Sequence, residues 1–102
     1  MNKIVYSPES KKDLDEIYDY IHDNLKNFLA AKNTISGIMK KISELKEYPQ
    51  LGSAWYLQND MNSGFRVLYH KNYIIFYTVK KEDICIVRIL HQRQNYVQQL
   101  FY

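Results

Sequence analysis

Four side chains in the C-terminal half of this 102-residue sequence are of types that could cleave an RNA backbone: Arg66, His91, Arg93 and Tyr96. Cleavage through the RNA's own 2′-hydroxyl requires a base for that proton, an acid for the leaving oxygen and cations beside the phosphorane charge. His91 can transfer protons near neutral pH, and each arginine can hold a phosphate through two hydrogen bonds. Tyr96 can stack on a base or donate a proton. The set is chemically sufficient for a ribonuclease.

Each of these side chains also has a structural interpretation that stays open. A histidine at the end of a strand is often partly buried and hydrogen-bonded, and this alternative applies to His91. Arg66 shares a predicted strand face with Leu68 and can pack its stem on the sheet while its charged group extends past the edge. Alternation puts Arg88 on the strand face of Ile84, Ile86 and Leu90, and we expect it to pair with a helix acid such as Asp15 or Glu16.

The sequence offers no pattern for a metal or a nucleotide cofactor. Its three histidines and its single cysteine, Cys85, lack ligand spacings such as Cys-x-x-Cys or His-x-x-x-His. Three glycines form no glycine-rich phosphate loop. The lone cysteine excludes an internal disulfide, and neither a signal-like start nor an apolar run of about 18 residues occurs. We therefore expect a cytoplasmic protein that binds no cofactor, no metal and no membrane.

Charge is unevenly distributed along the chain, although the formal net charge is only +3. Residues 9–23 hold six acids and two lysines, whereas residues 66–93 hold six lysines or arginines and two acids. A basic C-terminal half suits an anionic partner, either a nucleic acid or an acidic peptide. An ordinary solvated surface of mixed charge is the alternative.

Local patterns predict which elements would position these residues. Residues 3–6 are typical of a short strand, and Ser7-Pro8 can cap and begin a helix. Two stretches with apolar residues every three or four positions follow, the second capped by Asn27 and ended by Pro49. Two such amphipathic helices can pack together as an antiparallel hairpin.

The second half of the chain predicts an antiparallel meander. Residues 73–79 are apolar almost throughout, which is typical of a central strand covered on both faces. The strands expected are 54–57, 65–70, 73–79 and 84–91, with a helical turn within 95–102. We predict one α+β domain over residues 1–102, with a helical hairpin packed on a three- or four-stranded antiparallel sheet. Arg66, His91 and Arg93 are expected to converge on the open face of that sheet.

Taken together, these segments resemble the RelE/ParE superfamily of bacterial toxins over almost the whole chain. The resemblance is carried, in order, by residues 6–9, 13–17, 48–52, 65–68, 73–79 and 87–93. Each segment is weak by itself, whereas their order and spacing are specific. The resemblance implies the toxin of a type II toxin–antitoxin (plasmid stabilization) system, which inhibits growth until a cognate antitoxin protein neutralises it. Operator DNA would be bound only through the antitoxin.

The superfamily implies two alternative targets. RelE-like members are ribosome-dependent endoribonucleases that cut messenger RNA, whereas ParE-like members poison DNA gyrase. The nuclease pattern has cations where this sequence has Leu68 and Ile74, although the late arginine is kept as Arg93. The Pro49…Gly52 element and the His-Gln-Arg ending at 91–93 look more like the ParE branch.

The sequence therefore favours a ParE-like gyrase poison. A ribonuclease using Arg66, His91, Arg93 and Tyr96 is the alternative, so the pattern leaves open whether the protein is an enzyme. A third alternative is an inactive member that binds only its antitoxin. We also expect an amphipathic antitoxin segment, as a helix or an added strand, to cover the basic sheet face and the hairpin and to hide Arg66 and Arg93.

Overall fold

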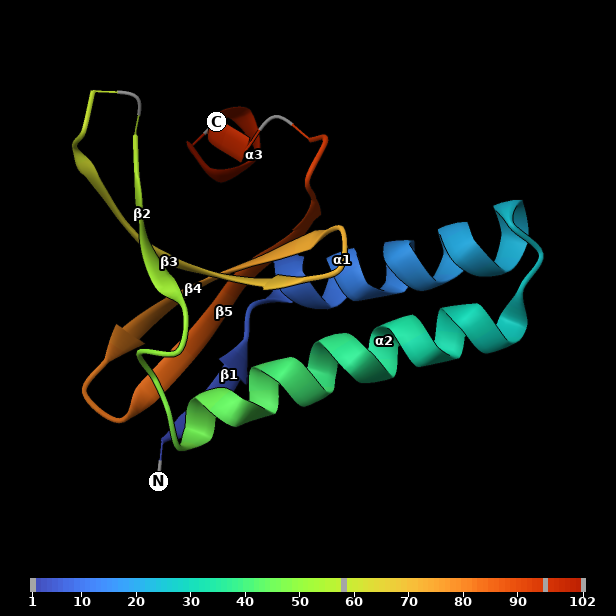
Figure 1. Cartoon of the computed structure of the whole chain (residues 1–102), viewed down its shortest axis with the longest axis horizontal. Coiled ribbons are helices and arrows are strands. Elements are labelled where there is room, and N and C mark those ends of the chain that lie inside the picture. The colour runs from blue at the N-terminus through green and yellow to red at the C-terminus, as the bar shows by residue number, and fades with distance from the viewer. Residues whose placement is uncertain (1, 58, 95, 102) are drawn as a thin grey trace.

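The computed structural model describes residues 2–57, 59–94 and 96–101, and two helices pack side by side on one face of a sheet (Figure 1). The strands are β1 (Lys3–Tyr6), β2 (Ser53–Tyr56), β3 (Asn62–His70), β4 (Tyr73–Lys80) and β5 (Asp83–His91). The helices are α1 (Pro8–Asp19), α2 (Phe28–Ser43) and α3 (Tyr96–Phe101), with a π-helical turn η1 (Tyr20–Asn24) and a 3-10 turn η2 (Glu44–Lys46). The predicted α+β class and the hairpin-on-sheet arrangement are confirmed.

The sheet has five strands rather than three or four, because the N-terminal strand joins it. The spatial order is β1-β5-β4-β3-β2, so β4 is the central strand, as its apolar run predicts. β1 pairs with β5 in parallel, with Lys3 opposite Asp83 and Tyr6 opposite Ile86. The other neighbours are antiparallel.

The helix boundaries follow from local capping. The Ser7 hydroxyl accepts a hydrogen bond from the backbone N–H of Ser10 at 3.0 Å, and Pro8 occupies the first turn of α1. The Asn27 side chain accepts from the N–H of Ala30 at 2.9 Å and caps α2. These caps satisfy N–H groups that have no partner within the helix, and they are confirmed predictions.

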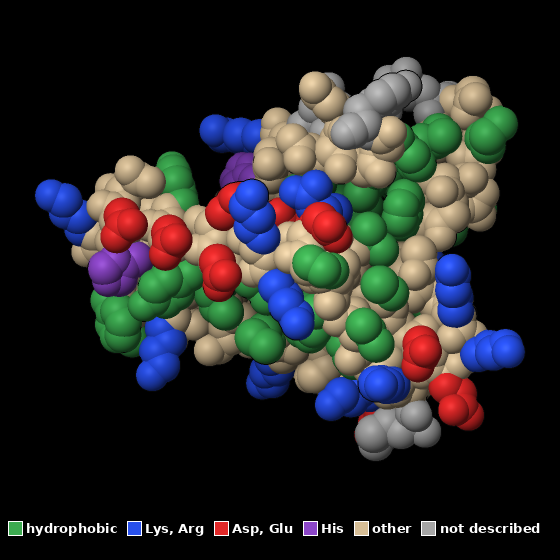
Figure 2. Space-filling view, turned by 180° about the vertical axis from the view of Figure 1, so that it is seen from behind, with side chains coloured by type: hydrophobic (Ala, Val, Ile, Leu, Met, Phe, Trp, Pro, Cys, Tyr) green, Lys and Arg blue, Asp and Glu red, His purple; other side chains and the backbone are tan. Residues whose placement is uncertain are grey.

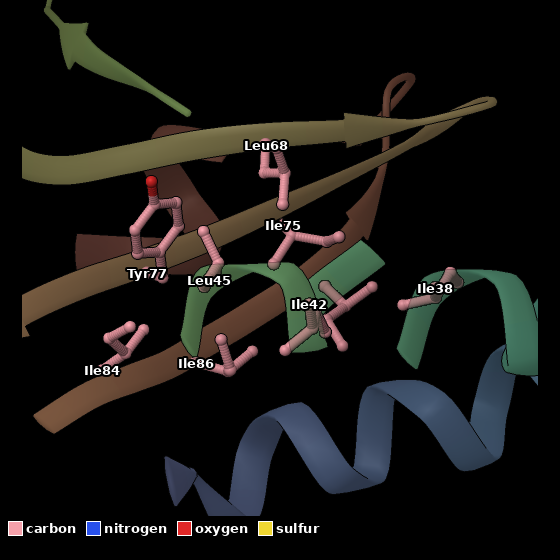
Figure 3. Close-up of a cluster of buried hydrophobic side chains, with 9 residues drawn as sticks. Ile38, Ile42, Leu45, Leu68, Ile75, Tyr77, Ile84 and Ile86 are labelled. Atoms are coloured by element: carbon pink, nitrogen blue, oxygen red, sulfur yellow. The ribbon is translucent and has the colours of Figure 1, made fainter. Parts of the chain in front are cut away.

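Apolar side chains fill both faces of the sheet. On the helix side, α2 and η2 pack onto three strands through Ile38, Ile42, Leu45, Leu68, Ile75, Tyr77, Ile84, Ile86 and Ile89 (Figure 3). On the far side, Leu100 of α3 packs against a second cluster made of Val67, Ile74, Phe76 and Leu90 with Trp55 and Phe65. The face that was expected to be open is therefore partly covered by the C-terminal helix.

A register shift between Phe76 and Tyr77 changes the face assignment along β5. One extra residue of β5, Val87, lies between Ile86, the partner of Tyr77, and Arg88, the partner of Phe76. Such a bulge reverses the alternation beyond it. Ile86 and Ile89 therefore both belong to the helix-side cluster, and the prediction that Arg88 shares the face of Ile84 and Ile86 is wrong.

None of the described helices is long and apolar enough to cross a membrane.

Candidate functional site

The structure does not bring Arg66, His91 and Arg93 together. Arg66 of β3 lies opposite Tyr77 of β4, whereas His91 of β5 lies opposite Tyr73. Four residues along β4 and two strand spacings place the Arg66 and His91 backbones roughly 16 Å apart. The expected convergence is therefore wrong, because Arg66 lies at one end of the central strand and His91 at the other.

Arg66 is engaged by the segment that connects α2 to β2. Its guanidinium donates to the carbonyl of Gln50 at 3.2 Å and to the carbonyl of Gly52. Its Nε donates to the hydroxyl of Tyr77 at 3.3 Å. With donors committed to backbone carbonyls and a buried phenol, the side chain fastens this segment to the sheet.

Tyr77 is the centre of that attachment. Its side chain is fully buried, and its hydroxyl donates to the carbonyl of Pro49 at 2.9 Å and accepts from the N–H of Gly52 at 3.0 Å. The ring packs in the helix-side cluster, while the hydroxyl lies at the cluster's margin (Figure 3). The Pro49…Gly52 element therefore has a structural basis in a hydrogen-bonded tyrosine.

His91 and Arg93 remain close to each other beside a groove of about 790 Å³ between the hairpin and the end of the sheet. The Nδ1 of His91 accepts from the backbone N–H of Arg93 at 3.1 Å, and its ring packs edge-on against Tyr73. When Nδ1 accepts, the neutral imidazole carries its proton on Nε2, which is then a donor. In this arrangement His91 has no free basic nitrogen to take a 2′-hydroxyl proton.

Tyr96 begins α3, but its side chain lies outside the part of the chain that the structure describes. The prediction that it takes part in a ribonuclease site therefore stays a prediction.

The groove beside His91 has walls of opposite charge. The sheet end contributes Lys71, His91 and Arg93, and α1 contributes Asp13 and Glu16. Most of the remaining lining residues are apolar, namely Ile17, Tyr20, Ile21, Leu25, Ala30, Tyr73 and Ile89, and the uncharged polar residues are Thr34, Asn72 and Gln94. Burial raises the pKa of the Tyr73 phenol, and the neighbouring Tyr20 raises it further. An apolar groove with charged margins is a surface that suits an amphipathic peptide better than a small polar substrate.

Apolar side chains are also exposed at the tip of the hairpin, next to this groove. Tyr20, Leu25, Phe28 and Leu29 are each more than half exposed, with values from 56% to 63%. Seen from behind, acidic side chains gather over the hairpin beside this apolar tip (Figure 2). Sequence reasoning missed this exposed patch, because Phe28 was counted among the apolar positions of the second predicted helix, which were expected to pack against the first helix.

Arg88 forms a buried ion pair with Asp13 of α1. Its Nε donates to Asp13 Oδ2 at 2.7 Å and its Nη2 to Oδ1 at 2.8 Å. Asp13 also accepts from the backbone N–H of Ile89 at 2.9 Å, and Arg88 Nη1 donates to the carbonyl of Gln99 in α3 at 3.2 Å. The hydrogen bond to Asp13 raises the pKa of Arg88. Pairing with a helix acid was expected, but the partner is Asp13 rather than Asp15 or Glu16.

His70 is packed under α2 rather than lying on the surface. A Cβ added at Gly37 would lie 2.6 Å from His70 Nε2, so α2 can approach this end of β3 only where residue 37 has no side chain. Nε2 is buried and has no hydrogen-bond partner among the described residues. Burial lowers the pKa of the imidazole, and the positive charges of Lys71 and Lys41 lower it further.

We expect acid to weaken the fold through His70. Because its folded pKa lies below the unfolded value of about 6.5, the neutral form is favoured in the fold. The contribution of the neutral His70 imidazole to the free energy of unfolding is full at a pH above the unfolded pKa. It is lost as the pH falls towards the lower folded pKa. Urea unfolding at pH 7.5 and 5.5 should show that the free energy of unfolding falls less between these two pH values for His70→Gln than for the wild type. His22→Gln, at an exposed histidine paired with Asp23, is the matched control. An equal decrease in the free energy of unfolding for the wild type and His70→Gln would contradict this prediction.

The described residues contain no group of three His, Cys, Asp or Glu side chains that could hold a metal ion.

Several known toxins of toxin–antitoxin systems are similar to this chain in sequence or in fold. The model of the family described as "ParE toxin of type II toxin-antitoxin system, parDE" matches residues 4–96. Toxin ParE3 of Caulobacter vibrioides is 28% identical over 102 residues, which cover 98% of this chain and 96% of that protein. The chromosomal ParDE TA system from P. aeruginosa has a chain with a TM-score of 0.74 and 22% identity, covering 89% of this chain and 96% of that one. YafQ from E. coli aligns over 100% of both chains with a TM-score of 0.56 and 18% identity.

Proposed function

The chain belongs to the ParE toxin family of type II toxin–antitoxin systems, and on this basis we propose that it inhibits bacterial growth by poisoning DNA gyrase. The observation that carries this choice of target is the burial of two apolar residues. Leu68 and Ile74, at the positions where the nuclease pattern has cations, are 6% and 5% exposed. They belong to the two cores on opposite faces of the sheet, so neither position can contact a phosphate.

The absence of cations at positions 68 and 74 has an energetic consequence that supports a target other than messenger RNA. A charge-assisted contact to the transition state typically contributes about 3 kcal/mol, or roughly a hundredfold in rate. Two such contacts are missing, and Arg66 is fastened to backbone carbonyls instead of compensating for them. Binding to gyrase requires surface complementarity and no bond-breaking residues in the toxin.

A ribosome-dependent endoribonuclease is the second candidate. It is favoured by His91 and Arg93, which lie side by side at the margin of an open groove together with Lys71 and Tyr73. Rotation of the His91 ring would free a basic nitrogen near these cations. An inactive member that binds only its antitoxin is the third possibility.

Induced expression of the toxin tests the target. We expect gyrase-linked DNA breaks and a DNA-damage response in the first minutes, while translated messages stay intact. His91→Ala and Arg93→Ala should keep this toxicity, because neither residue would take part in bond breaking. Codon-positioned cuts in messages without DNA damage, abolished by either substitution, would instead support the ribonuclease. An inactive member would show neither effect.

The partner we propose is a cognate antitoxin with an amphipathic segment. The solved structures with the same fold include a chromosomal ParDE toxin–antitoxin system and a DinJ–YafQ complex. In this chain the groove beside His91 and the exposed hairpin tip together offer apolar surface bordered by the exposed Arg93. An antitoxin that covers this surface would hide Arg93. Because Arg66 lies elsewhere and is already partly buried by its own segment, hiding it requires a second contact.

A further inference from the structure

Two stretches of the chain are almost free of charged residues. Residues 48–65 contain a single one, Asp60, and residues 94–102 contain no Asp, Glu, Lys or Arg, whereas charged residues make up 25% of the chain as a whole. Aromatic and amide residues are frequent in both stretches instead. Depletion of charge together with enrichment of aromatic residues is typical of the buried core of a protein–protein interface.

The fold brings these two stretches side by side. β2 and the start of β3 form a two-stranded arm (residues 53–57 and 59–65) that extends beyond the rest of the sheet, and α3 lies next to it (Figure 1). The ring centroids of Phe65 in the arm and Phe101 in α3 are 5.7 Å apart. Leu100 packs with Trp55 and Phe65 on the same cluster. The arm and α3 therefore form one continuous surface, which we call the arm–α3 surface.

Large apolar side chains remain exposed on the arm–α3 surface. Tyr56 and Met61 in the arm are 56% and 60% exposed, and Phe101 in α3 is 45% exposed. The upper right of Figure 2, where the arm lies, shows green apolar side chains among tan atoms and no red or blue ones. Removing such side chains from water is favourable, and an apolar patch of this kind indicates a site of interaction.

The lack of charge indicates what the arm–α3 surface can bind. DNA is held by lysines and arginines that neutralise its phosphates, and the described residues of this surface include neither. A charged peptide would leave its own charges without partners here, except near Asp60 in the turn of the arm. An uncharged, apolar protein surface fits, because both sides can then leave water without burying an unpaired charge.

The arm–α3 surface and the groove beside His91 lie on opposite faces of the sheet. Phe65 and Leu100 pack on the far-side cluster that contains Phe76. The groove is lined instead by α1, η1 and the helix-side residue Ile89. An antitoxin segment in the groove would leave the arm–α3 surface open, so this surface is available to a different protein.

A second copy of the chain is a less suitable occupant. It would join most simply by pairing the free edge of β2 with its own equivalent. The pairing of β2 with β3 is, however, interrupted by a register shift between Ala54 and Tyr56. Such an irregularity twists an edge away from regular pairing and protects it against edge-to-edge association.

We propose that the arm–α3 surface docks on an uncharged, apolar protein surface of DNA gyrase, and that this contact does not involve the DNA that gyrase holds. This inference rests on the proposed gyrase target. It assigns the two proposed partners to different faces of the toxin: gyrase to the arm–α3 surface and the antitoxin to the groove beside His91.

Binding of the full toxin to purified gyrase without DNA tests the docking surface. Phe101→Glu and Met61→Glu should each weaken the affinity roughly tenfold or more, because a carboxylate would be buried without a partner. Met39→Glu is the matched control and should leave the affinity unchanged. Met39 is 45% exposed, like Phe101, but it lies on α2, outside both the arm–α3 surface and the groove beside His91. Circular dichroism shows whether each variant is folded, and Phe101→Leu should keep the wild-type affinity.

Salt tests the absence of charge from the contact. The affinity of the wild type for gyrase without DNA should change less than about twofold between about 0.05 and 0.3 M salt, because the contact contains no charge pairs for salt to screen. A loss of roughly tenfold over this range would show a charged contact and would overturn the inference.

The remaining outcomes separate the docking surface from the target itself. If Phe101→Glu and Met61→Glu bind gyrase as tightly as Met39→Glu, or if binding requires added DNA, the inference is wrong and gyrase remains the target. If the wild type neither binds gyrase nor causes DNA breaks, both the inference and the target are wrong. A wild-type dimer in sedimentation that Phe101→Glu dissociates, with gyrase binding unaffected, would show that a second copy occupies the surface instead.

Discussion

Asp13→Ala is expected to lower the free energy of unfolding by about 3–5 kcal/mol, a large share of the total of about 5–15 kcal/mol for a typical domain. The Asp13 carboxylate is 5% exposed and accepts two hydrogen bonds from Arg88 and one from the N–H of Ile89. Its removal leaves a guanidinium that is mostly buried and a backbone N–H without their partner. Breaking a buried pair by removing one partner is costly for this reason.

Urea unfolding followed by circular dichroism measures this effect. Asp15→Ala is the matched control, because Asp15 is an exposed acid of the same helix and its loss should change stability by less than about 0.5 kcal/mol. A second substitution, Arg88→Met, should restore part of the stability of Asp13→Ala, because it removes the unpaired charge. If Asp13→Ala and Asp15→Ala are equally stable, the ion pair does not hold α1 to β5.

The partner of Arg88 shows what sequence spacing can and cannot identify. Three acids of α1 lie near one another in the sequence, and the prediction chose Asp15 or Glu16. Asp13, however, lies three residues after the buried Ser10 and four before Ile17, so it shares the helix face that packs on the sheet. Helical periodicity contained this signal. The bulge in β5 did not, because it depends on pairing with another strand.

Local signals account for the parts of the fold that were predicted correctly. Ser7 and Asn27 cap helices through hydrogen bonds to residues three positions later, and the apolar run of β4 marks a strand covered on both faces. Pairing between distant segments was not predictable in the same way. The parallel partnership of β1 with β5 joins residues about 80 positions apart in sequence, and nothing in either strand specifies it.

The expected convergence of Arg66, His91 and Arg93 is wrong for a geometric reason. Alternation correctly put Arg66 on the same face as Leu68, but that face is the one covered by α2. The carbonyls of Gln50 and Gly52, which hold Arg66, come from a segment whose path depends on where α2 ends. His91 and Arg93 were placed together correctly, because they are neighbours in sequence.

The attachment of the segment that connects α2 to β2 leads to the second prediction with a large expected effect. Tyr77→Phe should lower the free energy of unfolding by about 2–4 kcal/mol, because one hydroxyl serves three hydrogen bonds. The substitution keeps the ring in the helix-side cluster. It leaves the Pro49 carbonyl and the Gly52 N–H without this partner and removes one acceptor from Arg66. Unpaired buried groups cost more than the mean value of a hydrogen bond.

The effect should be local as well as global, which separates it from a general loss of packing. Exchange of the Gly52 amide should accelerate more than exchange in α1, because Gly52 N–H loses its acceptor. Tyr69→Phe is the control, since Tyr69 is 58% exposed and should change stability by less than about 0.5 kcal/mol. Gly52→Ala should reproduce the defect, because a Cβ there would lie 2.2 Å from the Val67 carbonyl and 2.8 Å from the Tyr77 hydroxyl. If Tyr77→Phe is as stable as Tyr69→Phe, the segment before β2 is held by Arg66 alone, and the Pro49…Gly52 element owes its conformation to that arginine rather than to the tyrosine.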